Sequence, residues 1–497
     1  DVGGRAAGPP GRPSLYSALP FRMVFSTALF LLWFLPAFLA GYWLLPRRAR
    51  NAWLLLASAL FYAWGAPRFL FVVLGVTFLD FRFVGRMAAC DDPGRKKAWL
   101  AASLGMNLGL LAYFKYSGFL VANLNALLGA AGLGPLPWAD VFLPLGISFY
   151  TFETVTYVVD VYRGVHAPLR SFLDYQLYIL LFPKLLAGPI VRYHEIADQV
   201  VNRSSRETAG RFLGGFVRFV VGLGKKVLVA DVLGVTVRKG FALDPSSIDA
   251  GAAWLLLAAF LLQIYFDFSG YSDMAIGLGA MVGFRLPENF RDPFVSASVT
   301  EFWTRWHVTL TAWMRNYLYV PLGGNRLGPR RTLLNLWAVF LVSGLWHGAS
   351  WNYVLWGAWH GFFLVAERSS FGKLVKRAGP AAGRAYTFVV FLASMALFRP
   401  AARLSVNLGT LAALAGGGSG TARIEADAEF LVTLGVGLFF AFFAALPGAP
   451  AVQRLVFDEE PSLPRQLALV PAALLLLVLC LSVVVWSPFS PFVYFRF

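Results

Sequence analysis

Long runs of apolar residues, separated by short polar or basic stretches, recur along almost the whole chain. A helix needs about 20 predominantly apolar residues to cross the hydrocarbon core of a bilayer. Most of the runs approach this length and contain few charges, so the pattern predicts a polytopic, all-α membrane protein. The runs fall at residues 24–45, 52–66, 68–82, 98–125, 141–162, 173–190, 212–236, 250–283, 332–346, 351–366, 384–399, 427–448 and 467–487.

Two stretches do not fit a simple membrane-spanning helix. The run "LFPKLLAGPI" at 181–190 is interrupted by proline and glycine, which predicts a re-entrant segment whose freed backbone groups find partners in protein or water. Residues 284–331 mix arginines with aromatic residues, so we expect this segment to lie at the interface or to fold back into the bundle. Its arginines could hold the phosphates of a nucleotide-like donor or anchor lipid headgroups, and composition favours neither.

The composition agrees with a membrane protein, because 58% of the residues are hydrophobic and only 14% are charged. The formal net charge of +17 comes from basic residues that lie mainly between the apolar runs. This placement is typical of cytoplasmic loops beside anionic lipid and argues against nucleic-acid binding. By the positive-inside rule, the basic stretches at 46–50, 81–97 and 161–170 are cytoplasmic, and the first helix runs inward.

The first 22 residues differ from the rest of the chain, since they are rich in Gly, Pro and Arg and show no apolar periodicity. We expect residues 1–22 to be a disordered tail or a wrongly assigned extension, with Met23 as the natural start. Residues 23–497 show neither a soluble domain nor an internal repeat, so they are expected to form a single membrane domain.

The chain has five histidines, which are His166, His194, His307, His347 and His360. No two are three or four residues apart, which removes the helix-borne metal pair of the HExxH type. The two cysteines lie near opposite ends of the chain and form no disulfide or zinc pattern. The sequence therefore predicts no metal site.

His347 is the strongest candidate for chemistry. An ionisable side chain at membrane depth is a functional hypothesis by default, and Gly344 and Gly348 leave room beside this one. The alternative is a neutral histidine that joins two helices through a backbone carbonyl, and the residues alone leave both open. His360 follows 13 residues later, and on one continuous helix it would face another direction.

His307 lies among tryptophans in "FWTRWHVTLTAW". It could orient a substrate or a second histidine, or it could rest at the membrane interface with its aromatic neighbours. His166 and His194 fall in predicted loops and are expected to be solvated.

A polar cluster within an apolar run needs internal partners. It consists of Asp267, Ser269, Tyr271, Ser272 and Asp273. A proton relay, an ion site and a structural network between helices all fit this composition.

Several motifs, in this order, closely resemble the membrane-bound O-acyltransferase (MBOAT) family, and most of all its bacterial branch typified by the alginate O-acetyltransferase. They are "PLGISFYTFETVTYVVDVYRG" at 144–164, "FPKLLAGPI" at 182–190, "FDFSGYSDMAIG" at 266–277, "ENFRDPF" at 288–294, "FWTRWHVTLTAWMRNYLYVPLGGN" at 302–325, "SGLWHGASWNYVLWGAWHG" at 343–361 and "PFVYFRF" at 491–497. Together they extend the likeness from about Met23 to the end.

The resemblance implies an all-α fold with about 11–13 transmembrane and re-entrant helices around a central tunnel. It implies that His347 of "LWHG" is the catalytic residue and that His307 of "RWH" faces the same tunnel, whereas the family does not rely on His360. Further residues are expected to line the tunnel or bind substrate: Asp267, Ser269, Tyr271, Arg305, Trp346 and Asn352.

The expected activity is acyl transfer in the inner membrane of a bacterium. An acetyl group would pass from a cytoplasmic thioester to a sugar hydroxyl of an exported polysaccharide such as alginate. The expected donor is acetyl-CoA, which acts as a co-substrate, and no tightly bound cofactor is expected. The transfer could be direct or could run through a periplasmic partner. Transfer of D-alanyl or another acyl group, and a polysaccharide transporter or flippase that uses Asp267 and Asp273, remain alternatives.

Overall fold

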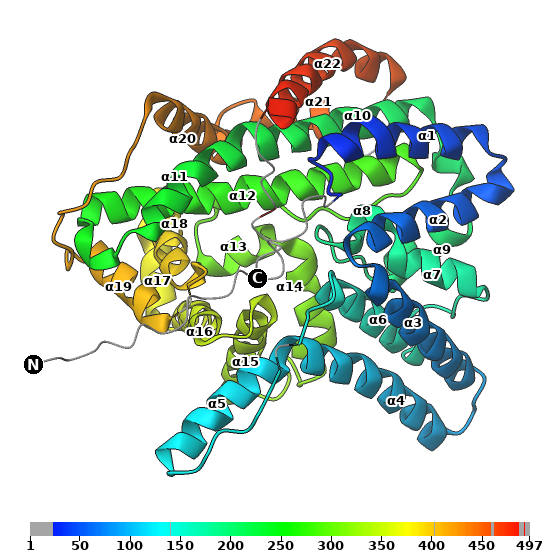
Figure 1. Cartoon of the computed structure of the whole chain (residues 1–497), viewed down its shortest axis with the longest axis horizontal. Helices are drawn as coiled ribbons and strands as arrows, with labels where there is room; N and C mark the ends of the chain where they lie inside the picture. The colour runs from blue at the N-terminus through cyan, green and yellow to red at the C-terminus, as the bar shows by residue number, and fades with distance from the viewer. Residues whose placement is uncertain (1–22, 140, 402, 459–461, 487–491, 493–497) are drawn as a thin grey trace, which may run out of the picture.

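The computed structural model describes residues 23–139, 141–401, 403–458, 462–486 and 492 as a bundle of helices (Figure 1). Within these residues the extended backbone pairs only once, in an antiparallel bridge between Phe290 and Trp306. The prediction of an all-α membrane protein is therefore confirmed. The extension predicted for residues 1–22 lies outside the described residues.

The longer helices follow the predicted apolar runs, and several short helices lie outside them. The first group comprises α1 (Leu35–Leu44), α2 (Arg47–Gly65), α3 (Pro67–Ala88), α4 (Pro93–Leu111), α5 (Ser117–Ala130), α6 (Ile147–Tyr162), α7 (Phe172–Leu180), α8 (Phe182–Leu185) and α9 (Tyr193–Val201). The second comprises α10 (Ala209–Gly224), α11 (Asp231–Ala242), α12 (Ala250–Met281), α13 (Val299–Arg305), α14 (Val308–Met314), α15 (Pro329–His347) and α16 (Trp351–Ala366). The third comprises α17 (Ser370–Arg377), α18 (Gly379–Phe398), α19 (Leu404–Leu414), α20 (Ala428–Ala441), α21 (Ala449–Phe457) and α22 (Leu463–Trp486).

Among the described helices, α12, α18 and α22 are long and apolar enough to cross a membrane. Shorter apolar helices cover Phe30–Leu44, Leu404–Leu414 and Ala428–Ala441. Helix α12 runs through the middle of the bundle (Figure 1). Most of its side chains are buried, whereas α22 exposes Leu475 and Val478, as a lipid-facing helix does. The number of membrane crossings and the central tunnel stay predictions.

Two of the predicted runs are helical but are divided by a π-helical turn, and at one of these turns α4 and α5 change direction (Figure 1). The run 98–125 contains the π-turn η3 (Ala112–Tyr116), and the run 212–236 contains η5 (Lys225–Ala230). Such turns occur frequently at functional sites. Helix α19 was not predicted as a separate apolar run.

Helices α10 and α12 lie side by side (Figure 1). They approach closely because their glycines face each other. A Cβ on Gly222 would lie 2.6 Å from the carbonyl oxygen of Gly270, and a Cβ on Gly215 would lie 2.6 Å from that of Gly277. Small residues at a crossing let helices gain packing contacts in lipid, where the hydrophobic effect does not drive their association. The glycines of "FDFSGYSDMAIG" thus fix the position of α12 in the bundle.

Helices α15 and α16 form a hairpin that also packs on glycines. A Cβ on Gly344 would clash with the carbonyl oxygen of Tyr353, and one on Gly357 would clash with that of Phe340. A Cβ on Gly348 would clash with the ring of Tyr353. The space that the sequence suggested for a substrate beside Gly344 and Gly348 is therefore filled by α16, and the glycines serve helix packing.

The broken segment 181–190 is buried along its whole length. The backbone N–H of Phe182 donates to Ser58 Oγ at 3.1 Å, and the N–H of Ile190 donates to Thr309 Oγ1 at 2.9 Å. The prediction that protein satisfies the freed backbone groups of this segment is confirmed for these two groups.

The charged and aromatic segment 284–331 folds back into the bundle, which was one of the two expectations for it. Phe302, Trp303 and Trp306 of this segment are buried, and α13 and α14 pack inside the chain rather than along its surface. This return brings His307 into the interior.

The glycine contact between α10 and α12 can be tested with one substitution. We expect Gly222→Val to lower the free energy of unfolding by about 1–3 kcal/mol, because the added atoms meet the backbone of α12. Gly435→Val is the matched control, since nothing lies within 4 Å of a Cβ at that position in α20. Thermal unfolding in detergent measures both, and equal melting temperatures for the two variants would contradict the proposed role of the contact.

Candidate active site

His347 is the last residue of α15, where the helix ends inside the protein. Aromatic rings enclose its imidazole: the centroids of Trp346, Trp356 and Phe398 lie 5.1, 5.0 and 5.1 Å from it. Trp346 belongs to the end of α15, Trp356 to α16 and Phe398 to α18, so the imidazole is held by packing on several sides. This environment excludes bulk water from the side chain.

His307 lies between α13 and α14 with a left-handed backbone, φ 46° and ψ 52°. This conformation is uncommon for residues other than glycine and persists only where the surroundings impose it. The next residue, Val308, donates its N–H to the carbonyl of Asn289 at 2.9 Å. Thr309 donates its hydroxyl to Asn289 Oδ1 at 2.9 Å. On the N-terminal side of His307, Trp306 forms the antiparallel bridge with Phe290. The "ENFRDPF" segment therefore imposes the turn that aims His307.

The side chain of Trp346 lies between the two motif histidines. Its ring centroid is 5.8 Å from that of His307 and 5.1 Å from that of His347. Phe152 also stacks on this indole, with its ring centroid 5.4 Å from that of Trp346 and 3.7 Å from that of Trp313. Three separate elements, α6, the α13–α14 turn and the end of α15, thus place two imidazoles around one indole. Two such groups can accept and donate protons at a shared substrate.

His360 has a different environment. Its Nε2 lies 3.1 Å from Ser394 Oγ of α18, and its ring packs against Trp303 and Trp356. The separate runs predicted at 332–346 and 351–366 correspond to α15, which ends at His347, and α16, which begins at Trp351. Because the two helices form a hairpin, both histidines contact Trp356, which the geometry of one continuous helix did not suggest. The bond to Ser394 joins α16 to α18, which is a structural arrangement.

Of the three interpretations of the polar cluster on α12, the structure favours the network between helices. Asp267 is buried and forms an ion pair with Lys226 of η5 at 2.7 Å. Asp273 forms ion pairs with Arg218 at 2.9 Å and with Lys225 at 2.6 Å. Buried charges of opposite sign hold the helices together only when they stay paired.

The other residues expected in the tunnel are spread over the bundle. Asn352 is buried and donates to the carbonyl of Leu397, next to a ring that encloses His347. Ser269 is buried in α12, and Tyr271 stacks on Phe25 at 4.8 Å. Arg305 forms a partly exposed ion pair with Glu301 at 2.9 Å. The structure therefore brings Trp346 and Asn352 to the His347 region, whereas the contacts described for Arg305 and Tyr271 are with Glu301 and Phe25.

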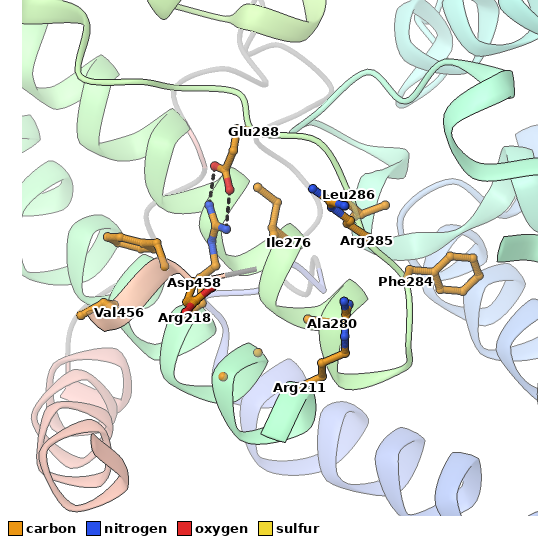
Figure 2. Close-up of a pocket in the computed structure, with 13 residues that line it drawn as sticks. Arg211, Arg218, Ile276, Ala280, Phe284, Arg285, Leu286, Glu288, Val456 and Asp458 are labelled. Atoms are coloured by element: carbon orange, nitrogen blue, oxygen red, sulfur yellow. Dashed lines mark hydrogen bonds and ion pairs between the residues drawn. The ribbon is translucent and has the colours of Figure 1, made fainter. Parts of the chain in front are cut away.

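A cleft lies elsewhere in the bundle, between α10, the end of α12 and α21 (Figure 2). It contains about 510 Å³ of space, part of it open to the outside. Arg211, Arg218 and Arg285 line it, and Figure 2 shows Arg218 pointing at Glu288, with which it forms two hydrogen bonds of 2.6 Å. The cleft holds Arg285 of the charged segment, but its lining does not include the histidines.

Sequence reasoning missed several charged residues inside predicted runs. Lys115 lies in the run 98–125 and contacts the end of α15, and the buried Lys184 forms an ion pair with Glu153 of α6. An ionisable residue within an apolar run was the signal that could have identified Lys115, Lys184 and Glu153. His194, expected to be a solvated loop residue, lies on α9 with its Nδ1 2.8 Å from Asp160.

Comparisons with known proteins identify the family of the chain. A profile of the membrane-bound O-acyltransferase family matches residues 140–398, which include His307 and His347. The chain is 45% identical to a Pseudomonas putida protein named "Probable alginate O-acetylase AlgI", over 76% of this chain and 77% of that one. It is 35% identical to the peptidoglycan O-acetyltransferase of Helicobacter pylori, over 70% and 71%. It is 27% identical to the teichoic acid D-alanyltransferase of Bacillus subtilis, over 44% and 58%.

The structural role of Asp267 can be separated from a role in substrate binding. Lys226→Met leaves Asp267 buried without this lysine, so we expect it to lower the free energy of unfolding by about 3–5 kcal/mol. Lys239→Met is the matched control, because the pair between Lys239 and Glu425 is exposed and contributes little. Thermal unfolding in detergent measures both. A Lys226→Met protein with normal stability and reduced activity would instead place Asp267 in a substrate site.

Proposed function

The chain belongs to the membrane-bound O-acyltransferase family and is an O-acyltransferase, and from this premise we propose that it transfers an acetyl group to a sugar hydroxyl of an exported polysaccharide. The observation that carries the proposal is the placement of His307 and His347 around Trp346 inside the matched region. The donor in this proposal is acetyl-CoA, a co-substrate that reaches the site from the cytoplasm.

The proposed reaction needs a base, because a sugar hydroxyl is a poor nucleophile until its proton is removed. His347 takes this proton, and the resulting oxygen attacks the thioester carbonyl. The C–S bond then breaks, the thiolate leaves with a proton returned to it, and the acetyl ester remains on the sugar. A positioned base of this kind contributes about 10²- to 10⁴-fold to the rate. His307 positions the donor or stabilises the negative charge that develops on the carbonyl oxygen.

The choice of acetyl group and acceptor rests on the relatives. Two named O-acetylating proteins, one for alginate and one for peptidoglycan, share 45% and 35% identity with this chain, whereas the D-alanyltransferase shares 27%. We therefore place alginate or a similar exported polysaccharide first among acceptors. Acetyl passes to the polymer directly or through a periplasmic acetyltransferase, and the protein is a multi-pass protein of the bacterial inner membrane.

A transporter or flippase is the rival from another class. It would need Asp267 and Asp273 as an ion or substrate site. Both carboxylates are instead paired with basic side chains of α10 and η5. These ion pairs support acyl transfer over transport as the function.

The proposed base can be tested by the same substitution at two histidines. We expect His347→Gln to lower acetyl transfer at least about 100-fold, because the base is lost. His360→Gln is the matched control, since glutamine retains a group at the position of Nε2 that bonds to Ser394. Membranes that contain each variant receive acetyl-CoA labelled in the acetyl group, and label in the polymer is counted. Normal transfer by His347→Gln would overturn the assignment.

The role of His307 calls for a substitution that tolerates its backbone. Asparagine adopts the left-handed region more readily than most residues, so His307→Asn removes the imidazole and keeps the turn. We expect kcat to fall about 100-fold, as when one group that stabilises the oxyanion is removed. The same assay measures kcat, and a variant that keeps the wild-type value would show that His307 has no part in the reaction.

A further inference from the structure

The helix that carries His347 ends inside the protein, where Gly348 donates its N–H to the carbonyl of Gly344 at 3.4 Å. The last carbonyl groups of an α-helix have no partners within the helix, and partners must come from elsewhere when the end is buried. In α15 the carbonyl of Leu345 accepts the hydroxyl of Tyr116 at 3.0 Å, and the carbonyl of Trp346 accepts the ammonium of Lys115. Two consecutive residues of the π-turn η3 therefore cap the helix that presents His347.

Lys115 is partly buried, and its contacts differ from those of three lysines that lie deeper in the bundle or at its helix contacts. Within the described part of the chain, Lys184, Lys225 and Lys226 each form an ion pair with a carboxylate. Lys115 forms none there, and its partners are two neutral oxygens, the Trp346 carbonyl and Ser148 Oγ at 3.3 Å. A cation without an acidic partner inside a membrane protein is costly to keep, and such residues mark functional sites.

The ammonium of Lys115 contacts the residue that joins the two motif histidines. It lies 5.7 Å from the centroid of the Trp346 ring as well as on the Trp346 carbonyl. Through Ser148 it also reaches the start of α6, the helix whose Phe152 packs on the same indole. One positive charge thus links η3, α6 and the end of α15.

A positive charge suits this position for two reasons. The C-terminal end of a helix carries a partial negative charge that a cation stabilises. A hydrogen bond from a charged donor is also roughly twice as strong as one between neutral groups. The bond from Lys115 therefore restrains the last turn of α15 more firmly than the neutral bond from Tyr116.

We propose that Lys115 is a positioning residue for acyl transfer, whose charge holds the Trp346–His347 end of α15 in the orientation that the reaction needs. The inference rests on the proposed function of His347. It predicts a loss in kcat rather than in donor binding, because Lys115 acts on the base through the backbone and misplacement of a reacting group by about 1 Å costs about 100-fold in rate.

Three variants in native membranes test the inference with labelled acetyl-CoA and the polysaccharide acceptor. We expect Lys115→Met to lower kcat about 100-fold with the KM for acetyl-CoA unchanged. Lys115→Arg keeps the charge and should return kcat to within about tenfold of the wild type. Tyr116→Phe removes only the neighbouring neutral bond and should stay within about threefold. If Lys115→Met does not accumulate, Lys115→Gln, which keeps a donor without the charge, takes its place with the same expected loss.

The inference would be overturned if Lys115→Met kept the wild-type kcat, or if Tyr116→Phe lost as much kcat as Lys115→Met. It would also be overturned if folded Lys115→Arg had a kcat no higher than that of Lys115→Met. A second readout separates this outcome from failure of the proposed function. In solid-state NMR of ¹⁵N-histidine-labelled protein, the signals that are absent from the spectrum of His347→Gln are those of His347. These signals should shift in Lys115→Met and stay in place in Tyr116→Phe. That shift is expected even if the wild type transfers no acetyl group, which would contradict the proposed function alone.

Discussion

Backbone N–H and C=O groups that are freed inside a membrane protein need partners in the protein or in water, because lipid offers none. The constraint acts most strongly where helices break. The segment 181–190 is held by Ser58 and Thr309, and the turn at His307 is held by Asn289. The end of α15 is capped by residues from η3. Each break is therefore closed by a residue from a distant part of the chain.

The candidate site lies where several of these closures meet. Glycines let α15 and α16 approach closely, so α15 can end in the interior and present His347 there. The bridge between Phe290 and Trp306 brings His307 to the same indole from another side. Because packing and backbone bonds fix both imidazoles, little reorganisation is needed when a substrate arrives, which is how preorganised sites lower a barrier.

The apolar runs and the motifs were sufficient to predict the fold class, the positions of the longer helices and the two histidines that meet at Trp346. They did not predict that Gly344 and Gly348 serve helix packing, because a glycine pattern does not show what approaches it. Nor did they pair Asp267 with Lys226, since the partner lies 41 residues away and only the fold brings it near. Lys115 was overlooked because a single lysine barely changes the hydropathy of a long run.

The most direct test of a site shared by His307 and His347 is a structure of the protein in nanodiscs with a non-transferable acetyl-CoA analogue, in which a methylene group replaces the thioester sulfur. The carbonyl of the analogue should lie within hydrogen-bonding distance of at least one of the two imidazoles, beside Trp346. An analogue whose carbonyl lies in the arginine-lined cleft of Figure 2, away from both histidines, would contradict the assignment of the active site.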